Sequence, residues 1–208
     1  MGLYDEVLRV IDILYALDEA REELIKLCRH VGRLARQIVL RIHAGKEVKG
    51  LLDEAAGKVK LILGYKDRYP ELYHGGLVYD TLAEYVEAVS LASFVLEGRI
   101  PGFEELGVGA VPYLLGLADL IGELRRLVLS QIRDLDFGGA ERTFKAMEEI
   151  YSALVQVAFP EAIVPGLRRK VDVAKRVIET TRKEMLFYRR SWELENRLRD
   201  LVEKATGT

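Results

Sequence analysis

Hydrophobic residues recur every three or four positions along most of the chain, which is the spacing of an α-helix with one buried face. The clearest stripe consists of Leu24, Leu27, Val31, Leu34, Ile38 and Ile42. Clusters of glycine and proline divide the pattern into segments. These predict helices over residues 3–44, 48–63, 77–97 and 112–134, a turn at 137–139 followed by a helix to 159, and a last helix that ends near residue 204. Because no strand pattern or tandem repeat occurs, the sequence predicts an all-α protein, a single elongated bundle of about six or seven helices over residues 1–208.

Two of the predicted helices contain unusual features. The first would be about 60 Å long at ~1.5 Å per residue, so we expect it to break near Asp18. The helix over 112–134 contains Gly116 and Gly122, and each costs roughly 0.8–1 kcal/mol relative to alanine. Close approach of a neighbouring helix or a ligand would explain why both glycines are tolerated.

Basic residues are almost absent from residues 69–124, whereas acidic residues persist there. Of the 31 Lys and Arg residues, only Arg99 lies in this stretch. Its nine acids are Glu71, Asp80, Glu84, Glu87, Glu97, Glu104, Glu105, Asp119 and Glu123. The stretch therefore carries a net charge of −8 and the rest of the chain +6, within a total of −2. Such asymmetry suits an acidic site within a basic surface that attracts a polyanion.

Four of these acids form two pairs at helical spacing. Glu84 and Glu87 are three residues apart, and Asp119 and Glu123 are four apart, so each pair projects from one helix face. No base is available locally to pair with them, and an uncompensated carboxylate in apolar surroundings is costly unless it is paired, protonated or metal-bound. If the two helices pack face to face, the four oxygen ligands would suit Mg²⁺ or Mn²⁺. The alternative is that the acids are solvated or pair with distant arginines such as Arg125 and Arg126.

A second set of residues suggests contact with nucleic acid. A basic row, which includes Arg33, lies opposite the apolar stripe of the first helix, and a basic run that ends at Arg68 leads into Tyr73 and His74. Cations beside an aromatic ring and a histidine are the mixture that single-stranded nucleic acid uses for phosphate contact and base stacking. The alternatives are a solvated helix face for the row and a hinge with an ordinary surface histidine for the junction.

Cysteine usage and hydropathy narrow the setting. Cys28 is the only cysteine, so no internal disulfide forms, and its apolar neighbours favour a packed thiol. No signal peptide is visible. Residues 77–96 are long and apolar, but three acids there, at roughly 2.5–3.5 kcal/mol each near a bilayer centre, argue against a membrane span. These features predict a cytoplasmic protein.

The two acidic motifs resemble a known family. They read Glu84-Tyr85-Val86-Glu87-Ala88-Val89-Ser90 and Tyr113-Leu114-Leu115-Gly116-Leu117-Ala118-Asp119-Leu120-Ile121-Gly122-Glu123-Leu124. Both are similar to the translin family, and within it to the translin-associated factor X branch. The resemblance implies an all-helical protein that assembles as a homo-octamer and binds single-stranded RNA or DNA. It also implies a Mg²⁺-dependent endoribonuclease, because the metal-binding acids of that branch occupy the positions of Glu84, Glu87, Asp119 and Glu123.

The implied mechanism is hydrolysis of a phosphodiester bond with Mg²⁺, or Mn²⁺ as a substitute, held by the four carboxylates. Arg33, Arg68, Tyr73 and His74 are the residues expected to hold RNA. The alternative is a nucleic-acid-binding scaffold without catalysis, as in the translin branch, which lacks the complete acidic set. A ferritin-like di-metal bundle is disfavoured, because that class needs a Glu-x-x-His motif on helices that also carry the other metal ligands, and His30, His43 and His74 do not supply one there.

Overall fold

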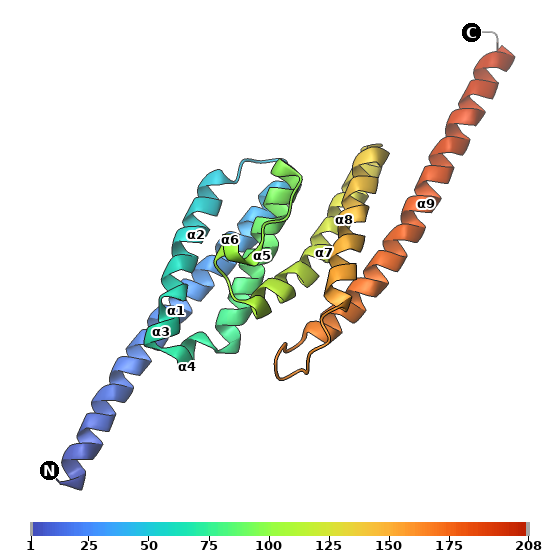
Figure 1. Cartoon of the computed structure of the whole chain (residues 1–208). Coiled ribbons are helices and arrows are strands. Elements are labelled where there is room, and N and C mark those ends of the chain that lie inside the picture. The colour runs from blue at the N-terminus through green and yellow to red at the C-terminus, as the bar shows by residue number, and fades with distance from the viewer. Residues whose placement is uncertain (1, 207–208) are drawn as a thin grey trace. The chain divides into compact units, whose positions relative to one another are not determined.

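The computed structural model describes residues 2–206, and all secondary structure in that range is helical (Figure 1). The helices are α1 (Leu3–His43), α2 (Lys49–Leu63), α3 (Tyr65–Arg68), α4 (Pro70–Tyr73), α5 (Gly76–Glu97), α6 (Phe103–Leu106), α7 (Ala110–Arg133), α8 (Phe137–Val155) and α9 (Leu167–Thr206). Three of them, α3, α4 and α6, are single turns of four residues. The remaining long helices lie close to the predicted ranges, and the predicted all-α class is confirmed. The turn expected at residues 137–139 is wrong, because α8 already begins at Phe137, where the Asp136 side chain accepts a hydrogen bond from the Gly139 backbone amide and caps the helix.

The chain forms two compact units that divide within α7. The first ends at Leu117 and the second begins at Ala118. The division into units favours two bodies, whereas the continuous helix α7 runs through the boundary between them. The single domain over residues 1–208 therefore stays a prediction.

In the first unit, α1 packs along α5 and α2 (Figure 1). The predicted stripe of α1 faces this core, and all of its members are buried except Leu27, which is half-buried. Val31 and Ile38 of α1 and Leu82 and Leu91 of α5 are fully buried. The core therefore forms where the helical periods of α1 and α5 match, and it fixes which face of α5 remains for polar side chains.

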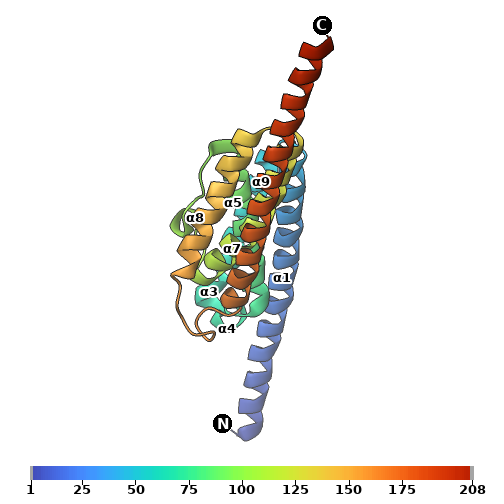
Figure 2. The same ribbon diagram turned by 90° about the vertical axis from the view of Figure 1, so that its right-hand side faces the viewer.

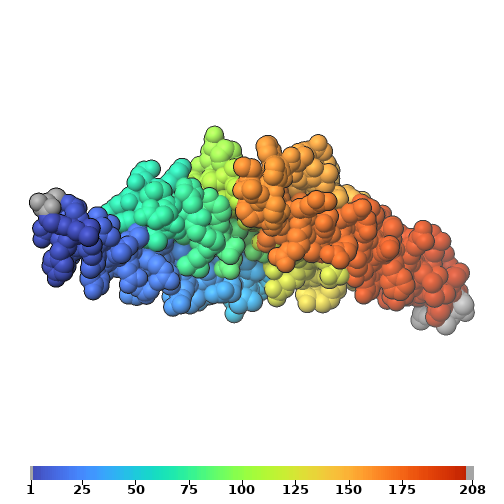
Figure 3. Space-filling view, turned by 90° about the horizontal axis from the view of Figure 1, so that it is seen from below, coloured from blue at the N-terminus to red at the C-terminus, as the bar shows by residue number. Residues whose placement is uncertain are grey.

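Helix α1 is continuous from Leu3 to His43, so the expected break near Asp18 is wrong. The chain contains neither glycine nor proline from Leu3 to Val31, and nothing therefore interrupts the backbone hydrogen bonds. The first turns of α1, in blue in Figures 2 and 3, extend past the other helices of this unit. Their large apolar side chains are consequently exposed.

In the second unit, α8 packs along α9, and Leu124 of α7 and Met147 of α8 are fully buried. Polar contacts cross between the helices as well. Thr143 Oγ1 of α8 donates a 2.9 Å hydrogen bond to Gln131 Oε1 of α7. This hydrogen bond joins the first part of α8 to the last part of α7.

The two glycines within α7 have different surroundings. A Cβ added at Gly116 would lie 2.6 Å from the carbonyl oxygen of Ala83 and 2.6 Å from Cβ of Val86, both on α5. The expected close approach of a helix is therefore confirmed at Gly116. Among the described atoms of the second unit, a Cβ added at Gly122 would meet none within 4 Å, so packing within that unit does not explain this glycine.

The structure also tests the predictions that Cys28 is a packed thiol and that no segment spans a membrane. Cys28 is only 2% exposed, and burial raises the pKa of its thiol, against the lowering effect of a hydrogen bond with Thr81. This confirms a packed, unreactive thiol. None of the helices within residues 2–206 is long and apolar enough to span a membrane.

Candidate metal site and nucleic-acid surface

The first pair of acids, Glu84 and Glu87, lies on α5, and both residues are half-buried. Glu84 is held against α1. Its Oε2 atom lies 2.9 Å from the position that a Cβ on Gly32 would occupy, and Arg36 Nη1 approaches the same oxygen at 4.0 Å. Because the Glu84 side chain remains 45% exposed, its carboxylate has contact with both protein and solvent.

The second pair, Asp119 and Glu123, lies on α7, and its side chains are 33% and 25% exposed. Lys170 Nζ, at the start of α9, donates to both carboxylate oxygens of Asp119, at 2.5 and 2.6 Å. Glu123 Oε2 lies 3.8 Å from Arg126 Nη1, one turn further along α7. Both acids therefore have a cation beside them.

A surface pocket of about 350 Å³ opens over Asp119 within the second unit. It is lined by Ala118, Asp119, Gly122, Arg169, Lys170, Val173 and Val177. The missing side chain of Gly122 leaves part of this space open. The pocket thus presents one carboxylate and two cationic side chains among small apolar ones, which gives a ligand access to Asp119.

The ion pairs favour, in part, the alternative that the acids pair with distant cations. Arg36 reaches Glu84 from α1, and Lys170 reaches Asp119 from α9. For Glu123 the expectation that no base lies nearby is wrong, because Arg126 is three residues away. Within the described residues, neither unit by itself gathers three carboxylate, histidine or cysteine side chains into a group that could hold a metal ion.

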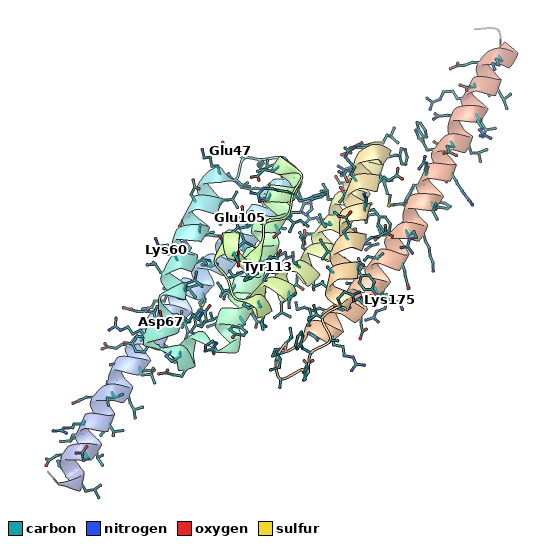
Figure 4. All side chains as sticks on the ribbon, viewed as in Figure 1. Glu47, Lys60, Asp67, Glu105, Tyr113 and Lys175 are labelled. Carbon is teal, nitrogen blue, oxygen red and sulfur yellow. The ribbon has the colours of Figure 1, made fainter. Side chains whose placement is uncertain are left out.

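Arg99, the single basic residue of the acidic stretch, forms ion pairs with acids outside the two pairs. Its guanidinium donates to both carboxylate oxygens of Glu105, at 2.8 and 2.7 Å, and to Glu97 at 2.7 Å. Glu105 lies on α6, beside the start of α7 (Figure 4). The hydrogen bond from Arg99 lowers the pKa of Glu105. Arg99 is thereby used locally, and the two acid pairs must draw their cations from elsewhere.

The residues predicted to hold RNA all lie in the first unit, and three of the four are exposed. Arg33 projects from α1. Arg68 places its guanidinium 5.2 Å from the ring centre of Tyr69, at the edge of a pocket of about 380 Å³. His74 Nδ1 lies 2.9 Å from the hydroxyl of Tyr79.

Tyr73 does not fit the predicted role. Its side chain is 4% exposed, and burial raises the pKa of its hydroxyl. A base cannot stack on a ring that solvent does not reach, so direct contact between Tyr73 and RNA is not supported by this geometry. Tyr73 instead packs edge-on against the neighbouring His74, with ring centres 5.2 Å apart.

Sequence reasoning missed the contact between Lys170 and Asp119. A signal was present, since Arg168, Arg169 and Lys170 all fall in the first turn of α9. Cations at a helix N-terminus oppose the helix dipole. Such a cluster therefore indicates that an anion from elsewhere, here Asp119, compensates it.

Comparisons with known proteins agree with the architecture. The Translin family model matches residues 19–191. The uncharacterized protein MJ0175 of Methanocaldococcus jannaschii is 34% identical over 199 residues, which cover 94% of this chain and 88% of the relative.

Solved structures support the same relationship. The crystal structure of AfC3PO is 35% identical, with a TM-score of 0.83, and the match covers 89% of this chain and 98% of that one. The complex of AfC3PO with duplex RNA is 33% identical with the same TM-score, over 89% and 97% of the two chains. Apo-NeC3PO, at 24% identity over 90% and 98%, has a TM-score of 0.80 and shows the fold alone. The family match and the identity over nearly the whole chain together show that this protein belongs to the translin family.

Proposed function

We propose that this protein is a metal-dependent endoribonuclease of the factor X type within the translin family. In this proposal the carboxylates of Glu84, Glu87, Asp119 and Glu123 hold Mg²⁺, and exposed cationic residues of the first unit hold RNA. The proposal rests on the complete set of four acids, and it extends the family membership to a reaction.

The observation that carries the proposal is the tight packing of α7 on α5 at Gly116. Its contact residues, Ala83 and Val86, each directly precede one acid of the first pair, and Gly116 stands one helical turn before Asp119. A helix that tolerates an unfavourable glycine in order to approach α5 there brings the carboxylate-bearing segment of α5 against the turn that leads into the second pair. We propose that the second pair, which lies beyond the division within α7, completes the metal site that the first pair begins.

The four side chains fit a hard divalent cation in their chemistry. Carboxylates offer only oxygen ligands, which Mg²⁺ and Mn²⁺ prefer. All four are half-buried rather than enclosed, so an ion can reach them from solvent. When bound, such an ion supplies electrostatic stabilisation to the charge that develops on a phosphodiester.

RNA as the ligand is supported by the relative AfC3PO, which has been solved in complex with duplex RNA. In this chain, Arg33, Arg68 and His74 are exposed on one unit, and we assign them to the phosphate backbone. Such contacts are electrostatic and weaken as salt is raised. Single-stranded RNA is the proposed substrate, with single-stranded DNA as a further ligand.

The second candidate function is a nucleic-acid-binding scaffold without catalysis. The contact of Lys170 with both oxygens of Asp119 favours it, because this pair neutralises one of the four acids without a metal. The two functions differ in whether RNA leaves the complex intact.

Removal of the metal ion distinguishes a nuclease from a non-catalytic scaffold, because only the nuclease depends on the ion to cleave RNA. With Mg²⁺ or Mn²⁺ present, single-stranded RNA labelled at one end is expected to yield internal cleavage products, and excess EDTA is expected to abolish them. Denaturing gel electrophoresis measures the products, and filter binding of the same RNA measures affinity. RNA that binds in a salt-dependent manner but stays intact with either metal would favour the scaffold.

Self-association is the second part of the proposal. The first turns of α1 expose an apolar stripe, which consists of Leu3, Tyr4, Val7, Leu8, Val10, Ile11, Ile13, Leu14 and Tyr15. Contiguous exposed apolar surface of this kind is typical of protein–protein contacts. We propose that it packs on further copies of the chain, in line with the homo-octamer that the family resemblance implies.

The double substitution of Val10→Glu and Leu14→Glu is expected to lower the molar mass in solution, because two charges would have to be buried in the contact. Size-exclusion chromatography with light scattering measures the mass. Asp12→Asn changes an exposed polar residue in the same turn and serves as the control. An unchanged assembly in the double variant would rule out this stripe as the contact.

A further inference from the structure

The ammonium group of Lys170 contacts both carboxylate oxygens of Asp119, which are the atoms that a metal ion would bind. The ammonium lies 2.5 and 2.6 Å from the two oxygens, which is the range of charge-assisted hydrogen bonds. Both side chains are about one-third exposed, at 29% and 33%. The pair is therefore neither enclosed in the core nor loosely solvated, and another cation can reach it.

Simultaneous contact of a divalent ion and the Lys170 ammonium with this carboxylate is unfavourable. Both would approach the same two oxygens, and two positive charges within a few ångströms of each other repel strongly where solvent screening is reduced. Binding of a metal ion to Asp119 therefore requires the ammonium to move away. The ion's net affinity is reduced by the contact that it displaces.

An open pocket lies beside the Lys170 ammonium. The pocket of about 350 Å³ over Asp119 is lined by Lys170 itself and by Gly122, which leaves space that a side chain would otherwise fill. A lysine has a flexible four-carbon stem and no fixed donor geometry. Rotation about the side-chain bonds of Lys170 is therefore the movement that would free the carboxylate.

We propose that Lys170 is an internal counter-ion that competes with the divalent cation for Asp119 and so limits how tightly the metal binds. The inference rests on the proposed function, in which Asp119 is a metal ligand. It goes further, because it assigns control of metal affinity to a residue outside the four acids. Lys170 acts through Asp119 and is a positioning residue rather than a catalytic one.

Mn²⁺ binding to the full-length protein without RNA, measured by electron paramagnetic resonance of the free ion, tests the inference. Lys170→Met removes the ammonium and keeps a long flexible side chain. It is expected to tighten Mn²⁺ binding about tenfold, since hydrogen bonds to charged groups are among the stronger ones. Lys170→Gln should shift the affinity in the same direction. Lys170→Arg retains a cation with two parallel donors and should bind Mn²⁺ no more tightly than the unmodified protein.

Arg169→Met is the matched control. Arg169 lines the same pocket and carries the same charge, but the two short contacts with Asp119 come from Lys170. Its loss should therefore change Mn²⁺ affinity less than about threefold, as expected for a screened interaction between exposed charges.

The outcomes separate the inference from the proposed function. If the unmodified protein binds Mn²⁺ and both neutral variants of Lys170 bind it equally or more weakly, the inference is overturned while the metal site stands. An Arg169→Met effect as large as that of Lys170→Met would also overturn it, because general charge would then explain both. If no variant binds Mn²⁺, the proposed function fails together with the inference. Circular dichroism in metal-free buffer identifies any variant that does not fold, and the other neutral variant then decides.

Discussion

Replacing Gly116 by alanine is expected to lower the midpoint of thermal unfolding by about 4–8 °C. The added Cβ would lie 2.6 Å from a backbone oxygen and 2.6 Å from a side-chain carbon of α5, and neither can rotate away. Overpacking of this kind costs about 1–3 kcal/mol, whereas the gain in helix propensity is only about 1 kcal/mol. At the upper end of that cost, a net loss of about 2 kcal/mol corresponds to this shift for a chain of this size.

Gly122→Ala in the same helix is the matched control. A Cβ there would meet no atom within 4 Å, so only the gain in helix propensity remains. The midpoint is expected to rise by about 2–4 °C, as about 1 kcal/mol of stabilisation gives at this size. Thermal unfolding followed by circular dichroism measures both. Equal shifts in the two variants would contradict the close approach of α7 and α5 at Gly116.

The second large effect concerns catalysis. Glu87→Gln preserves the volume of the side chain but replaces an anionic oxygen by an amide, so one ligand of the proposed metal site is lost. RNA cleavage in the presence of Mg²⁺ is expected to fall by at least about 100-fold, since even residues that only orient metal ligands are worth roughly 10–100-fold. RNA affinity in EDTA is expected to change less than about threefold, because that binding depends on cationic residues elsewhere.

Asp80→Asn provides the comparison for this experiment. Asp80 is an exposed acid on the same helix, one turn before Glu84, and it lies outside the two pairs. Its replacement removes the same charge from α5 and should leave cleavage within about twofold of the unmodified protein, because an exposed charge is screened by solvent. Unchanged cleavage by Glu87→Gln would remove the proposed site, and parallel losses in both variants would indicate that α5 charge alone matters.

Local patterns predicted the helices well but not their partners. The stripe from Leu24 to Ile42 identifies the buried face of α1, because helical period is a property of neighbouring residues. The same reasoning expected Tyr73 to be accessible, yet its burial follows from how α4 folds onto the rest of the first unit. It likewise treated Gly116 and Gly122 as equivalent, although only Gly116 meets another helix.

The order of residues alone predicted an all-helical chain with two acid pairs, because spacing along a helix determines which side chains share a face. The resemblance of these motifs to the translin family was confirmed by the family match over residues 19–191. The folded arrangement was needed to show that Lys170 neutralises Asp119 and that Arg36 approaches Glu84. Both contacts join helices that are far apart in the chain. Electrostatic pairing depends on distance in space, which follows from packing rather than from sequence separation.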